Sequence, residues 1–499
     1  MRGFVVLSCF LVLCAAVDYE ADRKLLIDVS LRRSIGYELQ LTPNEIEADD
    51  IFLSLKYAEL DEGFVNPKKF LVAQHFYEVR HNITESEVFK FIKKVPKGTA
   101  LHAHDLFMVS GDFFFNMTYK YADNLYVLDN PPNDIRVGFF NAGEQPSSWV
   151  LISSARENSS TFDVRLRSQL TLVVWNPKLV YNDTDDVWNR FRSTFPSTIP
   201  LITYQPIFKD CFYQALKELY EDNVKYLEFR GLFPQLYDLN NTAYDKDTLM
   251  QLYIDTTQEF INDFPDFWGT RFIYGPSRNV NQSVVQQYID DFLELQAKFP
   301  DFVVGFDLTD QEDKGRPLAD FIPQLQQLQN KTNFFFHAGE SDWFGEPTDE
   351  NLFDAILLGT KRIGHGFALI KYTLLMEMVK EKGIAIELSP ISNLIGILVN
   401  EARNHPGTYY IANNLPVVIC HDDPTIWGTK GVNYDWYVAF MGMTHRDNGL
   451  GTLKQLAINS IQYSAMTDDQ KSVAMNKWQA DWDQFIQEVL AEDNQLVIV

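Results

Sequence analysis

The strongest constraint on the fold is an alternation, from Pro96 onward, of short β-prone runs with amphipathic segments of helical periodicity. Eight such runs cover residues 98–104, 225–230, 270–274, 302–308, 333–337, 361–365, 384–389 and 416–421. Helical segments are expected at 211–223, 249–263, 283–299 and 318–330. Because eight parallel strands linked by helices close into a cylinder, the pattern predicts an α/β fold of the (β/α)8 TIM-type barrel class.

Two additions to the barrel are expected. Residues 17–95 show helical spacing of apolar residues, for example at Ile51, Leu55 and Ala58, and contain no catalytic motif. Residues 96–499 are assigned to the barrel domain, which the helices expected near 451–463 and 466–491 would complete. The distance from the first β-run to the second is too long for one crossover, so residues of about 112–186 are interpreted as an inserted module.

The first 16 residues have the pattern of a secretory signal peptide. Arg2 precedes the apolar run from Phe4 to Leu13, and the small residues Ala15 and Ala16 follow. That run is too short to cross a bilayer, and no later stretch is long and apolar enough to do so. Seven N-x-S/T glycosylation sequons begin at Asn82, Asn116, Asn158, Asn182, Asn240, Asn281 and Asn330. We therefore expect a secreted, extracellular glycoprotein without membrane insertion.

Charge and cysteine usage restrict the functional classes. The formal net charge of −25 disfavours nucleic acid and anionic membranes as partners, and fits a small neutral or cationic ligand better. Of four cysteines, Cys9 and Cys14 belong to the expected signal peptide, which leaves Cys211 and Cys420 to pair or stay free. The chain is therefore not a disulfide scaffold.

Metal-ligating and acid/base side chains recur where the expected strands end, on the face where barrels of this class carry their active sites. The first run ends in His102-Ala103-His104, and its alternation points both imidazoles the same way. Later runs end in His337 with Glu340, in His365, and in Asp422 with Asp423. Each alone is more often an ordinary buried histidine, turn or solvated carboxylate, but together they indicate a zinc-dependent active site.

Five segments resemble the adenosine deaminases of the metal-dependent amidohydrolase superfamily, in particular the branch of secreted adenosine deaminase-related growth factors. They are PKGTALHAHD (96–105), FFFHAGESDW (334–343), TKRIGHGFAL (360–369), ELSPISN (387–393) and CHDDP (420–424), in the order of the family. The resemblance extends over nearly the whole mature chain. The helical leader and the insertion after the first strand are similar to that branch's additions.

The resemblance implies a role for each motif residue. One zinc ion per chain would be held by His102, His104, His337 and Asp422, and would activate a water for attack on C6 of the purine. Glu340 would protonate ring nitrogen N1, and His365 would position and deprotonate the water. Asp423 would hold the ring at N7. The implied substrate contacts are Asp105, Trp188 and Gly339.

Two departures from the family's pattern stand out. The branch usually carries a disulfide in its inserted module, whereas residues 112–186 contain no cysteine. The family usually has glycine at the position of Asp310, and this glycine lets the backbone approach the purine closely. Asp310 either points into the pocket and alters substrate affinity, or a shifted loop turns it to solvent.

The expected function is hydrolytic deamination of adenosine and 2′-deoxyadenosine to inosine and 2′-deoxyinosine plus ammonia, which would lower extracellular adenosine. Alternatives are deamination of another purine and a non-catalytic growth-factor or binding protein on the same scaffold. A cytidine-deaminase type of zinc site is excluded because Cys211 and Cys420 cannot form its P-C-x-x-C motif. The resemblance further implies a homodimer through residues 17–95, and leaves a cell-surface receptor or glycan partner open.

Overall fold

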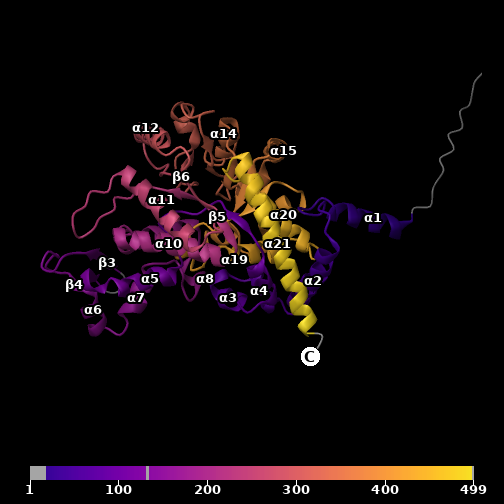
Figure 1. The fold of residues 1–499 in the computed structure, drawn as a ribbon, viewed down its shortest axis with the longest axis horizontal. Coiled ribbons are helices and arrows are strands. Elements are labelled where there is room, and N and C mark those ends of the chain that lie inside the picture. Colours follow the sequence, from indigo (N-terminus) through magenta and orange to yellow (C-terminus); the bar gives the residue numbers. More distant parts are fainter. Residues whose placement is uncertain (1–17, 131–133, 497–499) are drawn as a thin grey trace, which may run out of the picture.

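Eight parallel strand positions form a barrel in the computed structural model, which describes residues 18–130 and 134–496 (Figure 1). The expected signal peptide, residues 1–16, lies outside the described residues. The barrel strands are β1 (Gly98–Ala100), β5 (Val224–Gly231), β6 (Gly269–Tyr274), β7 (Val303–Phe306), β8 (Asn333–Phe334), β9 (His337–Ala338), β10 (Arg362–His365), β11 (Ala385–Leu388) and β12 (Val417–Ile419).

The hydrogen-bonding order of these strands follows their order in the sequence. One sheet runs β1-β5-β6-β7-β8 and the other β12-β11-β10-β9. β8 and β9 are two halves of the fifth barrel strand, interrupted at Phe335 and Phe336. A parallel bridge between Ala103 and Asp422 joins the end of the first strand to the end of the last. The predicted barrel and its eight strand positions are confirmed.

Helices surround the barrel, and five of the six segments predicted to be helical from their apolar periodicity are helices. The surrounding helices are α10 (Gln205–Glu221), α11 (Lys246–Asp263), α12 (Gln282–Lys298), α14 (Asn351–Leu358), α15 (Thr373–Lys382), α16 (Pro390–Ile395), α17 (Gly407–Ala412), α18 (Pro424–Trp427), α19 (Asn433–Met443), α20 (Leu450–Gln462) and α21 (Asp468–Leu496). The predicted helix 318–330 is wrong in length. Only η4 (Leu318–Phe321) and α13 (Ile322–Leu325) form there, and turns follow to Asn330, whose φ is 63°.

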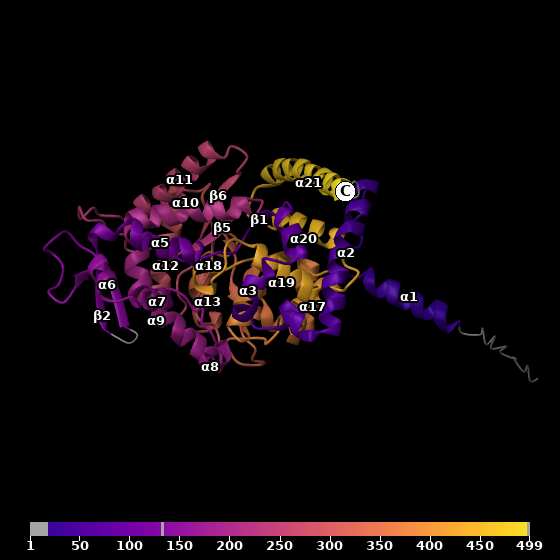
Figure 2. The same cartoon turned by 90° about the horizontal axis from the view of Figure 1, so that it is seen from below.

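The N-terminal region divides into helices that pack on the barrel and one that does not. α2 (Pro43–Val65), α3 (Phe76–Ile83) and α4 (Glu87–Lys94) cover the side of the barrel formed by α19, α20 and α21. The buried Lys56 of α2 donates hydrogen bonds to the hydroxyl of Thr444 and the carbonyl oxygens of His445 and Asn448. In contrast, α1 (Tyr19–Leu31) buries none of its residues and projects from the body of the molecule (Figures 1 and 2).

Residues 112–130 and 134–186 form a layer of helices on a small antiparallel sheet, at the end of the molecule opposite to α1 (Figure 2). Its elements are α5 (Gly111–Lys120), η3 (Ala122–Asn124), β2 (Leu125–Asn130), β3 (Asp134–Phe139), β4 (Val150–Leu151), α6 (Ile152–Asn158), α7 (Phe162–Ser168) and α8 (Pro177–Val180). Packing of buried side chains such as Val127, Val137, Phe162 and Leu166 holds it together without a disulfide. Cys211 and Cys420 are buried and free.

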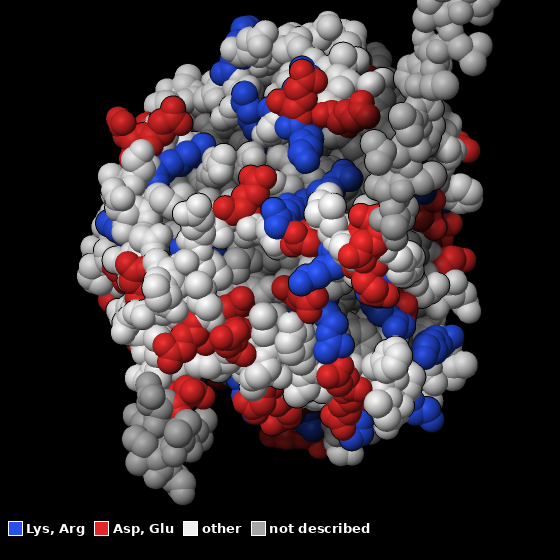
Figure 3. Space-filling model, turned by 90° about the vertical axis from the view of Figure 1, so that its right-hand side faces the viewer, with Lys and Arg blue, Asp and Glu red and all other residues white. Residues whose placement is uncertain are grey.

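Acidic and basic side chains are interspersed on the side of the molecule that carries α1 (Figure 3). Among the residues 18–130 and 134–496, no helix combines the length and the apolar composition that crossing a bilayer requires.

Candidate active site

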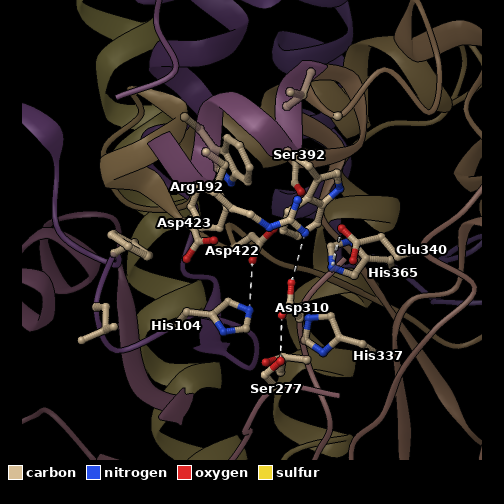
Figure 4. A pocket seen from close by; sticks show the side chains of 18 of the residues that line it. His104, Arg192, Ser277, Asp310, His337, Glu340, His365, Ser392, Asp422 and Asp423 are labelled. Atoms are coloured by element: carbon tan, nitrogen blue, oxygen red, sulfur yellow. Dashed lines mark hydrogen bonds and ion pairs between the residues drawn. The ribbon is translucent and has the colours of Figure 1, made fainter. Parts of the chain in front are cut away.

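A cavity of about 290 Å³ opens at the carboxyl ends of the barrel strands (Figure 4). Part of its wall comes from residues that follow the strands, among them His104 after β1, Ser277 after β6 and Ser392 after β11. Another part is the helix α9 (Thr184–Ile202), which follows the inserted module. This helix contributes Val187, Trp188, Phe191, Arg192, Phe195 and Ile199. The cavity therefore combines polar strand ends with a largely apolar cover, as enzyme pockets commonly do.

The predicted zinc ligands converge at the floor of this cavity. His102, His104 and His337 offer ring nitrogens that lie within 4.8 Å of one another. Oδ1 of Asp422 lies 3.5 Å from Nε2 of His102 and 3.3 Å from Nε2 of His104. Burial lowers the pKa of His337 to about 3 although Asp307 opposes this shift, so its ring is neutral and free to bind a metal. The structure brings all four predicted ligands together.

Carboxylates behind the imidazoles orient two of these ligands. Nδ1 of His102 lies 2.8 Å from Oε2 of Glu387, and Nδ1 of His337 lies 2.6 Å from Oδ2 of Asp307. Arg230 binds both carboxylates, with Nε at 2.9 Å from Asp307 and a terminal nitrogen at 2.6 Å from Glu387. A histidine whose Nδ1 donates to a carboxylate presents Nε2 as a metal ligand. Nε2 of His102 is buried and has no hydrogen-bond partner, as a position prepared for a cation requires.

The predicted acid/base residues lie beside the ligand cluster. Nε2 of His365 lies 3.5 Å from Oε1 of Glu340, and Nδ1 of His365 lies 3.1 Å from the side-chain amide of Asn393. Burial, reinforced by Asp422 and Glu312, raises the pKa of Glu340 well above its usual value. Burial lowers the pKa of His365, because the charged form of a histidine is the protonated one. Glu340 can therefore hold a proton at neutral pH while His365 is neutral, which suits proton transfer.

Asp422 and Asp423 carry different protonation states in adjacent positions. Burial opposes ionisation of Asp422, but its interactions with His102 and His104 prevail and lower its pKa. Burial and the neighbouring charge of Asp422 raise the pKa of Asp423. Asp422 is thereby anionic, as a metal ligand must be, while Asp423 can donate a hydrogen bond into the cavity.

Part of the backbone strain of the described residues lies at this cavity. Three of its non-glycine lining residues have positive φ angles: 60° at His365, 56° at Asp422 and 89° at Asp310. Side chains adopt this region at a cost, and structures retain such residues mainly where function requires them.

The predicted substrate contacts have different surroundings. Trp188 and Asp105 line the cavity, and Oδ2 of Asp105 accepts a hydrogen bond of 2.7 Å from the hydroxyl of Tyr253. Burial raises the pKa of Asp105 to about 7. Gly339 is not among the described residues that line the cavity, and its N–H donates to Glu312 at 2.9 Å. Asp310 lines the cavity and pairs there with Arg192 rather than turning to solvent, whereas its expected effect on substrate affinity stays a prediction.

Several residues of the site carried no motif in the sequence. Glu312 accepts hydrogen bonds from the backbone N–H groups of Gly339 and Glu340, at 2.9 and 2.6 Å, and so fixes the segment that carries Glu340. Arg230 and Arg192 were also missed. Glu387 stands inside the quoted segment ELSPISN, but only its position behind His102 shows what it does.

Comparisons with known proteins agree with this geometry. The family model described as adenosine deaminase matches residues 163–480, and the model described as the adenosine/AMP deaminase N-terminal region matches residues 12–92. An adenosine deaminase of Lutzomyia longipalpis is 42% identical over 462 residues, which cover 91% of this chain and 90% of the relative. Human adenosine deaminase 2 is 36% identical over 502 residues, covering 96% of this chain and 97% of the relative.

Among solved structures, an amidohydrolase from Burkholderia ambifaria with bound zinc has the same fold, with a TM-score of 0.54 and 18% identity. The match covers 81% of this chain and 95% of that one. The chain therefore belongs to the adenosine deaminase family of the amidohydrolase superfamily, in the branch of the adenosine deaminase-related growth factors, and is an adenosine-deaminating hydrolase.

Proposed function

We propose that the protein is a secreted, zinc-dependent enzyme that converts adenosine and 2′-deoxyadenosine to inosine and 2′-deoxyinosine with release of ammonia. Such an enzyme would lower extracellular adenosine. The observation that carries the proposal is the cluster of three histidines and Asp422 beside Glu340, in a cavity at the carboxyl ends of the barrel strands.

The donor set fits zinc better than magnesium or calcium. Three neutral imidazoles and one carboxylate match the ligand preference of zinc, whereas the harder cations prefer oxygen ligands. The unpartnered Nε2 of His102, with Glu387 behind its other ring nitrogen, supports this assignment. A zinc ion held by His102, His104, His337 and Asp422 would supply an acidified water as the nucleophile.

The chain's own side chains would perform the proton transfers. Glu340, which burial keeps protonated, would donate its proton to N1 of the purine as the water oxygen bonds to C6. His365 would position the water and accept a proton from it. Asp423, whose pKa is also raised, would donate a hydrogen bond to N7. His365 would then return its proton to the amine, so that the C6–N bond breaks and ammonia leaves, while the hydroxyl proton at C6 would pass to the Glu340 carboxylate as the carbonyl of inosine forms.

The remaining contacts would hold the sugar and the ring. Trp188 and Asp105 line the cavity and are proposed to contact the ribose. Gly339, next to Glu340 in the chain, is proposed as a further substrate contact, and its N–H is already bonded to Glu312.

Conversion of adenosine by purified protein tests this function directly. The ultraviolet change from adenosine to inosine is expected with adenosine and 2′-deoxyadenosine, with adenine and AMP assayed in parallel. Preference for adenine would favour a different purine substrate. No turnover of any of the four compounds by zinc-loaded protein would favour the non-catalytic binding protein.

Secretion is supported by the placement of the sequons. All seven sequon asparagines are exposed, so an oligosaccharide could be attached at each without disturbing the core. The expected signal peptide would provide the entry to the secretory route. N-terminal sequencing of the exported chain tests this, with a start near Val17 expected.

We also propose that α1 mediates a homodimer. Leu25 and Leu26 of this helix are 58% and 70% exposed, Tyr19 is 69% exposed, and none of its residues is buried. Several large apolar side chains exposed on one helix can mark an interaction site. A second copy is the occupant that the resemblance implies, while α2, α3 and α4 already pack on their own barrel.

Light scattering is expected to give a mass of twice one chain, and Leu26→Asp is expected to give one chain. Leu374→Asp is the matched control, because Leu374 is 62% exposed but belongs to a different helix, α15. A parent protein that is monomeric at micromolar concentration would contradict the dimer. A cell-surface receptor or glycan as a further partner has no specific support in the geometry.

A further inference from the structure

Asp310 and Arg192 form an ion pair inside the cavity, between a barrel loop and the covering helix α9. Oδ1 of Asp310 lies 3.6 Å from a terminal nitrogen of Arg192, and Figure 4 shows the arginine extending toward the carboxylate. The same arginine nitrogen donates to Oε1 of Gln311 at 2.8 Å. Both side chains line the cavity, with exposed fractions of 42% for Arg192 and 28% for Asp310.

The position of the Asp310 carboxylate is held despite its backbone cost. Its φ of 89° lies in the left-handed region, where a side chain is disfavoured. Three interactions offset this cost. The hydroxyl of Ser277 donates to Oδ2 at 2.7 Å, the N–H of Gln311 donates to Oδ1 at 2.8 Å, and Arg192 provides the opposite charge. The carboxylate is therefore a fixed part of the cavity wall.

The cavity has an excess of acidic groups. Among the described residues that line it, five carry carboxyl groups: Asp105, Asp310, Glu340, Asp422 and Asp423. Arg192 is the one lysine or arginine among them. The positive charge of Arg192 could attract an anionic group on a substrate. Asp310 neutralises that charge.

We propose that Asp310, by pairing with Arg192, makes this site select nucleosides over nucleotides. The inference rests on the proposed function, which places the purine at the buried ligand cluster and Glu340. The sugar then lies toward the more exposed part of the cavity, where Arg192 is found. A phosphate on the sugar would meet an arginine whose charge Asp310 already neutralises, so its desolvation would not be repaid.

The test compares kcat/KM for AMP with kcat/KM for adenosine in the parent enzyme and in Asp310→Asn. Asparagine tolerates the left-handed backbone and can still accept the Ser277 hydrogen bond, but it releases the charge of Arg192. The AMP-to-adenosine ratio is expected to rise about tenfold, as for one new charge-assisted contact to a phosphate. Inhibition by inosine monophosphate, measured against inosine, should strengthen in parallel.

Two further variants separate this effect from a general loss of negative charge. Asp186→Asn removes a carboxylate from the first turn of α9 whose hydrogen bonds go to Asn182 rather than to Arg192 or Gln311, and its ratio should stay at the parent value. Arg192→Gln combined with Asp310→Asn should abolish the gain. An unchanged ratio in Asp310→Asn, or a gain that survives loss of Arg192, would overturn the inference. A parent that does not deaminate adenosine would instead overturn the proposed function.

Discussion

Replacement of Glu340 by Gln is expected to lower kcat by about a thousandfold while leaving the metal content unchanged. The carboxyl group lies 3.5 Å from Nε2 of His365 and, because its burial raises its pKa, it carries a transferable proton at neutral pH. Glutamine has nearly the same shape and can still form hydrogen bonds, but it has no acidic proton to give to N1. The loss should therefore appear in kcat, with a smaller change in KM.

Glu346→Gln is the matched control for this experiment. Glu346 is an exposed carboxylate six residues further along the same segment, outside the cavity. Its variant should keep the parent rate and the parent metal content. If Glu340→Gln retained near-normal turnover, the assignment of the proton donor would be wrong. If it lost its metal, the rate would report on the metal site, and a metal-replete preparation would be needed for the comparison.

The barrel could be predicted because its signal is local and repeated. Each β-run is short and apolar, and each is bounded by a turn and followed by a helical period, so eight independent observations support one topology. The fifth strand shows where this signal ends. Its run at 333–337 appears continuous in the sequence, but the ladder is interrupted at Phe335 and Phe336. Such an interruption depends on neighbouring strands and leaves no local mark.

The four proposed metal ligands could be predicted because each one follows a strand in the same barrel. Alternation brings His102 and His104 to one side, and the shared face brings His337 and Asp422 to them. The groups behind them could not be predicted in this way. Arg230 binds Asp307 and Glu387 from a different strand, 77 and 157 residues away in the sequence, so the pairing exists only in the folded barrel.

Asp310 shows a different limit of sequence reasoning. A non-glycine residue at a position that a family usually fills with glycine indicates a change, but it does not indicate which way the side chain points. Its orientation depends on Ser277 and Arg192, which come from the loop after β6 and from α9. Neither is close to Asp310 in the sequence, and the path of α9 over the barrel could not be inferred from its composition.

Removal of the metal is expected to abolish deamination. It should also lower the melting temperature by about 4 °C or more, because an ion that binds the folded state and not the unfolded state stabilises the protein. The ligand cluster gathers three imidazoles and Asp422 in a buried site, and Nε2 of His102 has no other partner there. Activity and stability should both return with zinc but not with magnesium, whose oxygen preference the imidazoles do not meet. Metal analysis should find one zinc per chain.

A substitution in the cluster distinguishes loss of the ion from a side effect of the chelator. His104→Gln should lose zinc and activity together, whereas His445→Gln should lose neither, because His445 is 51% exposed and outside the cavity. Full activity after chelation, with no zinc found by metal analysis, would contradict the ligand assignment. Hydrogen bonds would then have to stabilise the cluster without an ion. Glu387 would hold His102, Asp307 would hold His337, and the imidazoles of His102 and His104 would hold Asp422.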